Sequence, residues 1–364
     1  MRIGIITQPL YKNYGGILQN YALQQVLKRM GHQPVTLVGL RYTKKEYINT
    51  LIATLFGKNQ SLKLKDIPKS YKRRMVPKLT WRFVTRNINL SSSRYTHSES
   101  GVLNEKLDTI IVGSDQVWRP KYNKGYMEAN LYAGFLEHCQ NLTIREIAYA
   151  TSFGTSEWEY TSEQEERCAQ LIKKFDAVSV RETSGVKLCA EFLRRNDAVC
   201  VLDPTLLLDK SDYEWLCRKV KHPKLKRKTL LAYILDPTDI IIKDLHNLAD
   251  KESMDLSIVF ADDKISLSVE EWLSQFRDAD AVITNSYHGT IFSIIFGKPF
   301  FTMINKERGE DRFNSLFISL GIPSVNFGFS IPNNISISNW SIISKNLDIL
   351  KKRSTDFLIQ SLHQ

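Results

Sequence analysis

The sequence lacks the patterns that mark several large classes of protein. Its five cysteines never fall in a CxxC spacing, which excludes a cysteine zinc site and a disulfide framework and is typical of a cytoplasmic protein with reduced thiols. The seven histidines contain no pair spaced four residues apart, so a histidine-rich zinc site is not supported either. No P-loop lysine motif or GxSxG motif is present. No apolar run approaches the roughly 20 residues that span a bilayer.

What the sequence does have is length and positive charge. The 364 residues predict about two domains, and 43% hydrophobic with 24% charged residues is ordinary for a globular protein. The formal net charge of +11 indicates an anionic partner.

Much of this charge lies in a basic insertion at residues 41–94, where Glu46 and Asp66 are the only acidic residues. Apolar residues between Tyr47 and Phe56 repeat at helical spacing, so the insertion could lie on the inner face of the cell membrane. It could equally pack its apolar stripe on the domain. We expect no nucleic-acid partner, because no nucleic-acid-binding module accompanies the basic run.

Short apolar runs, each ending in polar residues, recur along the first half of the chain. Residues 108–112 lead to Asp115, and residues 177–180 lead to Arg181. Because parallel strands place their carboxyl ends at one rim of a sheet, these side chains are expected to meet there. The Gly15-Gly16 pair, at the start of a predicted helix, allows a close backbone approach.

The second half centres on residues 280–300. A buried strand at 281–284 precedes a polar turn at 285–289 that carries His288, and a helix is expected from Thr290. A lone histidine is more often a core residue than a ligand, but this one lies where α/β sheets bind anions. The carboxylates of Asp278-Ala279-Asp280 precede the strand instead of following it, which does not favour a metal site.

These patterns predict an α/β fold of the GT-B-like type, with two Rossmann-like, doubly wound domains facing a central cleft. We place the N-terminal, acceptor-side domain at residues 1–207 and the C-terminal, donor-side domain at residues 208–340. Residues 341–364 are expected to form a helix that could cross back to the first domain.

Seven short motifs, in order along most of the chain, resemble the polysaccharide pyruvyl transferase family. They are Tyr14-Gly15-Gly16-Ile17-Leu18-Gln19-Asn20-Tyr21-Ala22-Leu23, Val112-Gly113-Ser114-Asp115-Gln116-Val117-Trp118, Ser152-Phe153-Gly154, Ser179-Val180-Arg181-Glu182, Leu202-Asp203-Pro204-Thr205, Thr284-Asn285-Ser286-Tyr287-His288-Gly289 and Asp311-Arg312-Phe313.

The resemblance implies an enzyme that moves pyruvate from phosphoenolpyruvate onto a sugar of a surface polysaccharide or its lipid-linked precursor, forming a ketal and releasing phosphate. Some members have an arginine two residues before the histidine. Here that position is Ser286, so Arg312 or Lys298 would supply the missing cation. The implied donor site comprises Arg181, Ser286, Tyr287, His288, Gly289, Lys298 and Arg312. The expected acceptor side comprises Asn13, Tyr14, Gly15, Gly16, Ser114, Asp115, Gln116 and Trp118.

The chemistry suits three of these residues as catalysts. A protonated His288 would be the general acid, Arg181 would neutralise the leaving phosphate, and Asp115 would accept a proton from the attacking hydroxyl. The scheme requires no metal and no cofactor. Two other functions remain open, a GT-B glycosyltransferase with a nucleotide-sugar donor and a non-catalytic anion-binding protein at a membrane surface. The acceptor sugar and the choice between a ketal and an enolpyruvyl ether also stay open.

Overall fold

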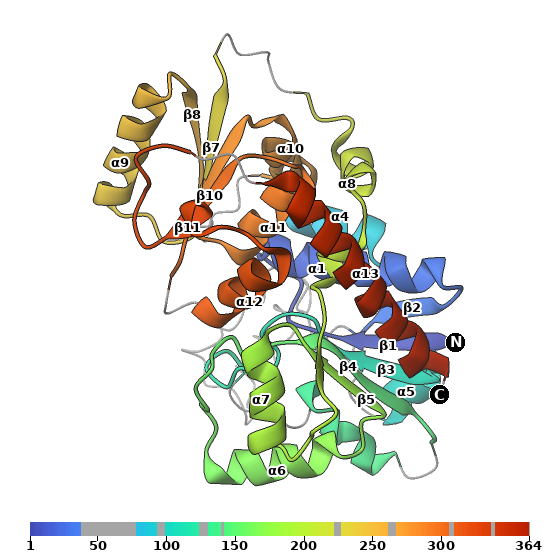
Figure 1. The fold of residues 1–364 in the computed structure, drawn as a ribbon. Helices are drawn as coiled ribbons and strands as arrows, with labels where there is room; N and C mark the ends of the chain where they lie inside the picture. The colour runs from blue at the N-terminus through green and yellow to red at the C-terminus, as the bar shows by residue number, and fades with distance from the viewer. Residues whose placement is uncertain are drawn as a thin grey trace, which may run out of the picture.

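The computed structural model describes residues 1–37, 78–92, 99–123, 130–139, 142–221, 227–260, 267–305, 309–335 and 339–363. These residues form two parallel β-sheets, one above the other in Figure 1, with helices packed around each.

The first sheet has six parallel strands in the order β2-β1-β3-β4-β5-β6. Its strands are β1 (Arg2–Ile6), β2 (Gln33–Thr36), β3 (Thr109–Val112), β4 (Arg145–Thr151), β5 (Ala177–Val180) and β6 (Val199–Cys200). The accompanying helices are α1 (Tyr14–Arg29), α4 (Lys78–Asn87), α5 (Glu99–Glu105), η3 (Gly134–His138), α6 (Ser162–Ile172), α7 (Thr183–Glu191) and η4 (Pro204–Leu207). The chain builds outward from β1 to β2 and then returns to the other side of β1, so the strand order reverses between β1 and β3.

The second sheet has five parallel strands in the order β11-β10-β9-β7-β8. Its strands are β7 (Thr229–Ile234), β8 (Asp255–Phe260), β9 (Ala281–Thr284), β10 (Phe300–Met303) and β11 (Phe327–Gly328). Its helices are α8 (Lys210–Cys217), α9 (Asp239–Lys251), α10 (Val269–Asp278), α11 (Tyr287–Ile295), α12 (Glu310–Leu320), η6 (Ser324–Asn326) and the long C-terminal α13 (Trp340–His363). Here the order reverses between β7 and β9.

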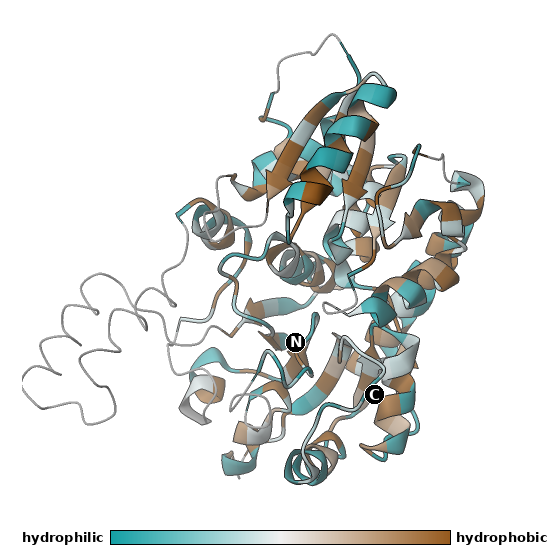
Figure 2. Cartoon of the chain, turned by 90° about the vertical axis from the view of Figure 1, so that its left-hand side faces the viewer, coloured by the Kyte–Doolittle hydropathy of each residue, from teal (hydrophilic) through white to brown (hydrophobic). Residues whose placement is uncertain are grey.

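Two doubly wound parallel sheets confirm the expected α/β, GT-B-like fold. The first sheet ends at Cys200 and the second begins at Thr229, while the boundary at residue 207 stays a prediction. Figure 2 shows mainly apolar strands flanked by helices that carry both hydrophilic and apolar residues, as expected for parallel sheets covered by helices.

Only part of the basic insertion lies within the described residues. The helix expected between Tyr47 and Phe56 lies outside them. Helix α4 buries Phe83 and Val84 completely, and Leu90 forms a bridge to Thr36 beside β2. This part of the insertion therefore belongs to the N-terminal domain. Within the described parts of the chain, no helix is both long and apolar enough to cross a bilayer.

Helix α13 packs on both domains, against α12 of the second and η4 of the first. It runs diagonally past both domains in Figure 1 and ends near the N-terminus. The backbone N–H of Leu202 donates to Ser354 Oγ at 2.9 Å, and Arg145 donates to the carbonyl of Ser361 at 3.1 Å. The C-terminal helix is thus hydrogen-bonded to the first domain.

Glu146 on β4 gives the fold a pH dependence. It is 8% exposed, and burial raises its pKa to about 7, with Lys174 opposing the shift and Asp176 adding to it. The unfolded value is near 4.5, so the folded state binds the extra proton between these values. Folding stability therefore falls as the pH rises from about 4.5 to about 7, by up to about 3 kcal/mol.

We expect Glu146→Gln to remove this dependence, because the amide never ionises. In urea unfolding, the variant should be more stable than the wild type at pH 8 and close to it at pH 5. Glu191→Gln, at an exposed position on α7, is the matched control and should follow the wild type. A Glu146→Gln variant with wild-type pH dependence would contradict the assignment.

Candidate functional site

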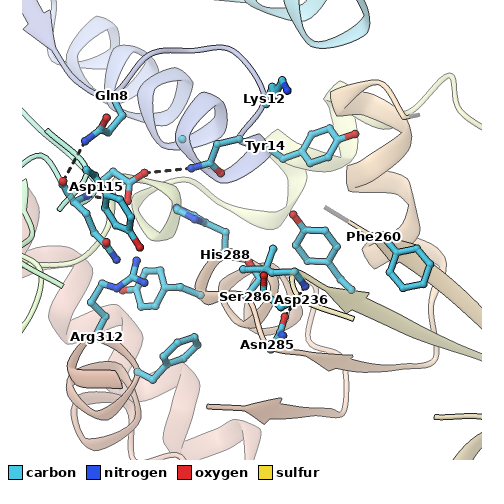
Figure 3. A pocket seen from close by; sticks show the side chains of 18 of the residues that line it. Gln8, Lys12, Tyr14, Asp115, Asp236, Phe260, Asn285, Ser286, His288 and Arg312 are labelled. Carbon is cyan, nitrogen blue, oxygen red and sulfur yellow. Dashed lines mark hydrogen bonds between the residues drawn. The ribbon is translucent and has the colours of Figure 1, made fainter. Parts of the chain in front are cut away.

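A cavity of about 640 Å³ lies between the two sheets, at the points where their strand orders reverse. The first domain contributes residues that follow β1 and β3 and begin α1, namely Gln8, Lys12, Asn13, Tyr14, Asp115 and Gln116. The second domain contributes residues near the ends of β7, β8 and β9, among them Tyr233, Asp236, Phe260, Asn285, Ser286 and His288. Figure 3 shows His288 and Ser286 in the middle of this cavity.

His288 lies on the first turn of α11. Ser286 is the N-cap residue, and its hydroxyl accepts a hydrogen bond from Gly289 N at 3.3 Å. Because of this cap the helix begins at Tyr287, three residues before the expected start at Thr290. The first-turn N–H groups and the positive end of the helix dipole therefore lie at the cavity.

Asp203 connects His288 to Arg181. Its Oδ2 lies 2.6 Å from Arg181 Nη1 and 3.5 Å from His288 Nε2, and Oδ1 accepts two hydrogen bonds from Thr205. Burial alone would raise the pKa of Asp203, but His288 and Arg181 outweigh it and hold the pKa well below its usual range. Asp203 belongs to the Leu202-Asp203-Pro204-Thr205 motif, but the sequence does not predict it as a site residue.

Arg181 does not line the cavity. Its side chain has no exposed surface, and it is shared between Asp203 and Asp115, whose Oδ1 is 3.2 Å from Nη2. Its guanidinium also lies over the ring of Tyr287, 4.6 Å from the centroid. Arg181, which the sequence predicts to bind the donor, therefore lies behind the cavity wall. There it holds two carboxylates and an aromatic ring in position.

Among the arginines that the structure describes, Arg312 is the one that lines the cavity. It extends from α12 and lies on the same ring of Tyr287, at 5.1 Å from the centroid. Burial and the neighbouring Arg181 lower its pKa to about 10, although Asp115 and Glu182 partly offset them. A cation whose charged form is disfavoured in this way gains stability when an anion binds beside it.

Lys298, the other candidate cation, follows Gly297 beyond the far end of α11. It is half-buried and does not line the cavity. Burial and Lys210 lower its pKa. Because His288 lies on the first turn of the same helix, the two residues are separated by the length of that helix.

Asp115 is held in the cavity by a strained loop after β3. Its φ is +81°, an uncommon value for a residue with a side chain. Ser114 is buried and anchors the loop, since its N–H donates to Gln19 Oε1 at 3.1 Å and its carbonyl accepts from Thr7 at 3.0 Å. Burial would raise the pKa of Asp115, but Arg181 and the other nearby cations lower it, so the carboxyl is ionised. Ser114 thus positions Asp115 and does not line the cavity itself.

Trp118 and Gly289 are also absent from the cavity lining. Trp118 is fully buried, stacks on Tyr132 at 4.8 Å and donates its indole N–H to the carbonyl of Leu131 at 2.9 Å. The chain turns back into the core after Gln116, which is why the expected acceptor role does not fit Trp118. A Cβ on Gly289 would lie 2.3 Å from Thr284 Oγ1, so this glycine allows α11 to pack on β9.

Gly15 brings the two domains together at His288. A Cβ at this position would lie 2.0 Å from His288 Nδ1. The expected close approach therefore exists, but its partner is the imidazole. Gly16, Asn13 and Tyr14 do line the cavity, as expected residues of the acceptor side.

A family model described as polysaccharide pyruvyl transferase matches residues 13–307, which is most of the chain. The chain belongs to the polysaccharide pyruvyl transferase family. The matched range includes every cavity residue named above except Gln8, Lys12 and Arg312.

Solved structures resemble this family member in fold at very low sequence identity. UDP-GlcNAc 2-epimerase from Methanocaldococcus jannaschii is 10% identical, with 100% of this chain and 99% of that chain covered and a TM-score of 0.47. A putative UDP-N-acetylglucosamine 2-epimerase from Listeria monocytogenes is also 10% identical, with 99% and 90% covered and a TM-score of 0.49. The glycosyltransferase SsfS6 from Streptomyces sp. SF2575 is 10% identical, with 99% and 96% covered and a TM-score of 0.38. No curated protein matches the sequence.

Sequence reasoning missed one side of the cavity. Asp236 and Phe260 lie at the carboxyl ends of β7 and β8, and Gln8 follows β1. Their signal in the sequence is the same as that of Asp115, a polar or aromatic residue at or just after the end of a strand.

We expect Gly15→Ala to displace the imidazole of His288, because the new methyl group cannot occupy its position. Any activity that uses His288 should fall by about tenfold or more, since small displacements of a catalytic group cost up to about 10²-fold. The measurement is turnover beside thermal unfolding. Gly31→Ala is the control, because its Cβ meets no atom within 4 Å and its positive φ costs stability alone. Equal effects on turnover in both variants would show that the contact with His288 is unimportant.

Proposed function

We propose that the protein transfers pyruvate from phosphoenolpyruvate to two hydroxyl groups of a sugar, forming a ketal and releasing phosphate, during the synthesis of a cell-surface polysaccharide. Family membership supports the reaction class. The observation that carries the proposal is the presence of a buried histidine–aspartate pair and a buried arginine, Arg312, at one cavity.

The donor would bind at Arg312 and the N-terminus of α11. Phosphoenolpyruvate carries a phosphate and a carboxylate, and both are anions that a guanidinium and first-turn N–H groups bind well. Ser286 and Tyr287 lie at the same helix start. Arg312 thereby takes the place of the arginine that some family members carry two residues before the histidine.

His288 would donate the proton that begins the reaction. Nε2 is buried and lies 3.5 Å from Asp203, which leaves Nδ1, on the side of Gly15, for exchange with the donor. A carboxylate behind a histidine fixes the orientation of the ring. Proton transfer to the methylene carbon makes it a methyl group and leaves the adjacent carbon electron-deficient.

Asp115 lies on the first-domain side of the cavity and would orient the attacking hydroxyl. Two new C–O bonds form at the central carbon of the donor, and its C–O bond to phosphate breaks. Of the two hydroxyl protons lost, one replaces the proton given by His288 and the other leaves with phosphate. The reaction therefore balances without an oxidant, a reductant or a cofactor.

The test is phosphate release from phosphoenolpyruvate, measured with methyl glycosides of galactose, glucose, mannose and N-acetylmannosamine as acceptors and with mass spectrometry of the product. We expect release with at least one acceptor and a product heavier by the ketal. His288→Asn should lower turnover by about 10²-fold or more. His246→Asn, at an exposed histidine on α9, is the matched control. Transfer from UDP-sugars, with no phosphate release from phosphoenolpyruvate, would refute the proposal.

Substitution of Arg312 should mainly affect substrate binding, and substitution of Arg181 should mainly affect stability. Arg312→Gln should raise the KM for phosphoenolpyruvate by about tenfold to a hundredfold, because it removes a charge-assisted hydrogen-bond donor, and should lower the free energy of unfolding less than Arg181→Gln does. Arg181→Gln leaves Asp203 and Asp115 buried without their cation, so it should lower the free energy of unfolding by about 3–5 kcal/mol. Urea unfolding and steady-state kinetics of both variants check this. A stable Arg181→Gln protein with a selective rise in that KM would make Arg181 the donor ligand instead.

A further inference from the structure

The cavity is longer than the donor site. Figure 3 shows Asp115 and Arg312 on one side of His288, and Phe260 and Asp236 on the other. The volume of about 640 Å³ is in the range of sites that hold a drug-sized ligand, which is larger than a three-carbon phosphate. The half with Phe260 and Asp236, which we call the outer half, has no part in the proposed chemistry.

The outer half is built by the ends of β7 and β8. Phe260 is the last residue of β8, at the edge of the sheet, and it is 38% exposed whereas the neighbouring strand β7 is almost entirely buried. Asp236 follows β7, and Asn305 donates to its Oδ2 at 3.2 Å. Tyr233 on β7 also lines the cavity, with its ring edge-on to Trp272 at 5.3 Å.

This combination suits a neutral, hydroxylated ring. An exposed phenyl face offers apolar contact area to the C–H face of a pyranose, and a carboxylate accepts hydrogen bonds from hydroxyl groups at the ring edge. The negative charge of Asp236 disfavours a second phosphate or carboxylate at this position. A phosphate-bearing group would instead be drawn toward Arg312, on the other side of His288.

We propose that the outer half is a second sugar-binding subsite, in which Phe260 stacks on one sugar ring and Asp236 binds its hydroxyl groups. The inference rests on the proposed function, since it takes the reacting sugar to lie between Asp115 and His288. It follows that the acceptor is at least a disaccharide, and that Phe260 and Asp236 determine which second sugar is accepted.

The experiment compares methyl glycosides of single sugars with the corresponding β-linked disaccharides, such as methyl galactoside with methyl lactoside. For the wild type, the KM of the better disaccharide should be lower by about tenfold, the value of one good stacking contact. Phe260→Ala and Asp236→Asn should remove this advantage while leaving kcat and the monosaccharide reaction near the wild-type values. Phe329→Ala, at a phenylalanine that is 62% exposed and does not line the cavity, is the matched control.

Binding without the donor separates this inference from the proposed function. Saturation-transfer NMR of the same glycosides should show tighter binding of disaccharides to the wild type than to Phe260→Ala. Equal binding of mono- and disaccharides, or UMP binding that Phe260→Ala abolishes while disaccharides do not bind, would overturn the subsite. Failure of phosphate release alone would refute the proposed reaction and leave the binding result to decide the subsite.

Discussion

The site depends on one buried carboxylate. Asp203, from the first domain, contacts Arg181 of its own domain and His288 of the other. A buried carboxylate is costly unless cations and hydrogen-bond donors surround it, and here Thr205 donates two further hydrogen bonds. The carboxylate therefore requires that the imidazole and the guanidinium converge, which fixes the relative position of the domains where the cavity forms.

The domains can approach closely at His288 because glycines leave room there and because aromatic rings from the two domains stack. Gly15 leaves room for the imidazole, and Gly309, with φ +101°, allows the start of α12 to approach the carbonyl of Gly154. Tyr14 extends from α1 into the second domain, where it stacks on Trp272 at 5.2 Å. These contacts all surround one cavity, so a ligand there is contacted from both domains and its affinity depends on how closely they approach.

The sequence predicted the elements well because apolar periodicity is a local property. The strands at Ala177–Val180 and Ala281–Thr284 have the bounds expected, and residues after strand ends did meet at a cavity. The placement of Trp118 and Lys298 could not be read in this way. Whether a side chain after a strand faces the cavity or the core depends on the path of the loop and on the other domain, and neither leaves a periodic signal. Asp203 could not be recognised from the sequence for the same reason, because its role depends on His288 in the other domain.

Arg181 and Arg312 both lie on the ring of Tyr287, but their surroundings suit one to structural support and the other to ligand binding. Arg181 has two carboxylates within 3.2 Å, and these raise its pKa against the effect of burial. Arg312 lies on the same ring of Tyr287, but burial and the charge of Arg181 lower its pKa to about 10. An anion beside Arg181 would add to ion pairs that already exist, whereas an anion beside Arg312 would offset the cost of burying its charge. The charge balance around each guanidinium, and not the presence of an arginine in a motif, thus indicates which one a ligand would meet.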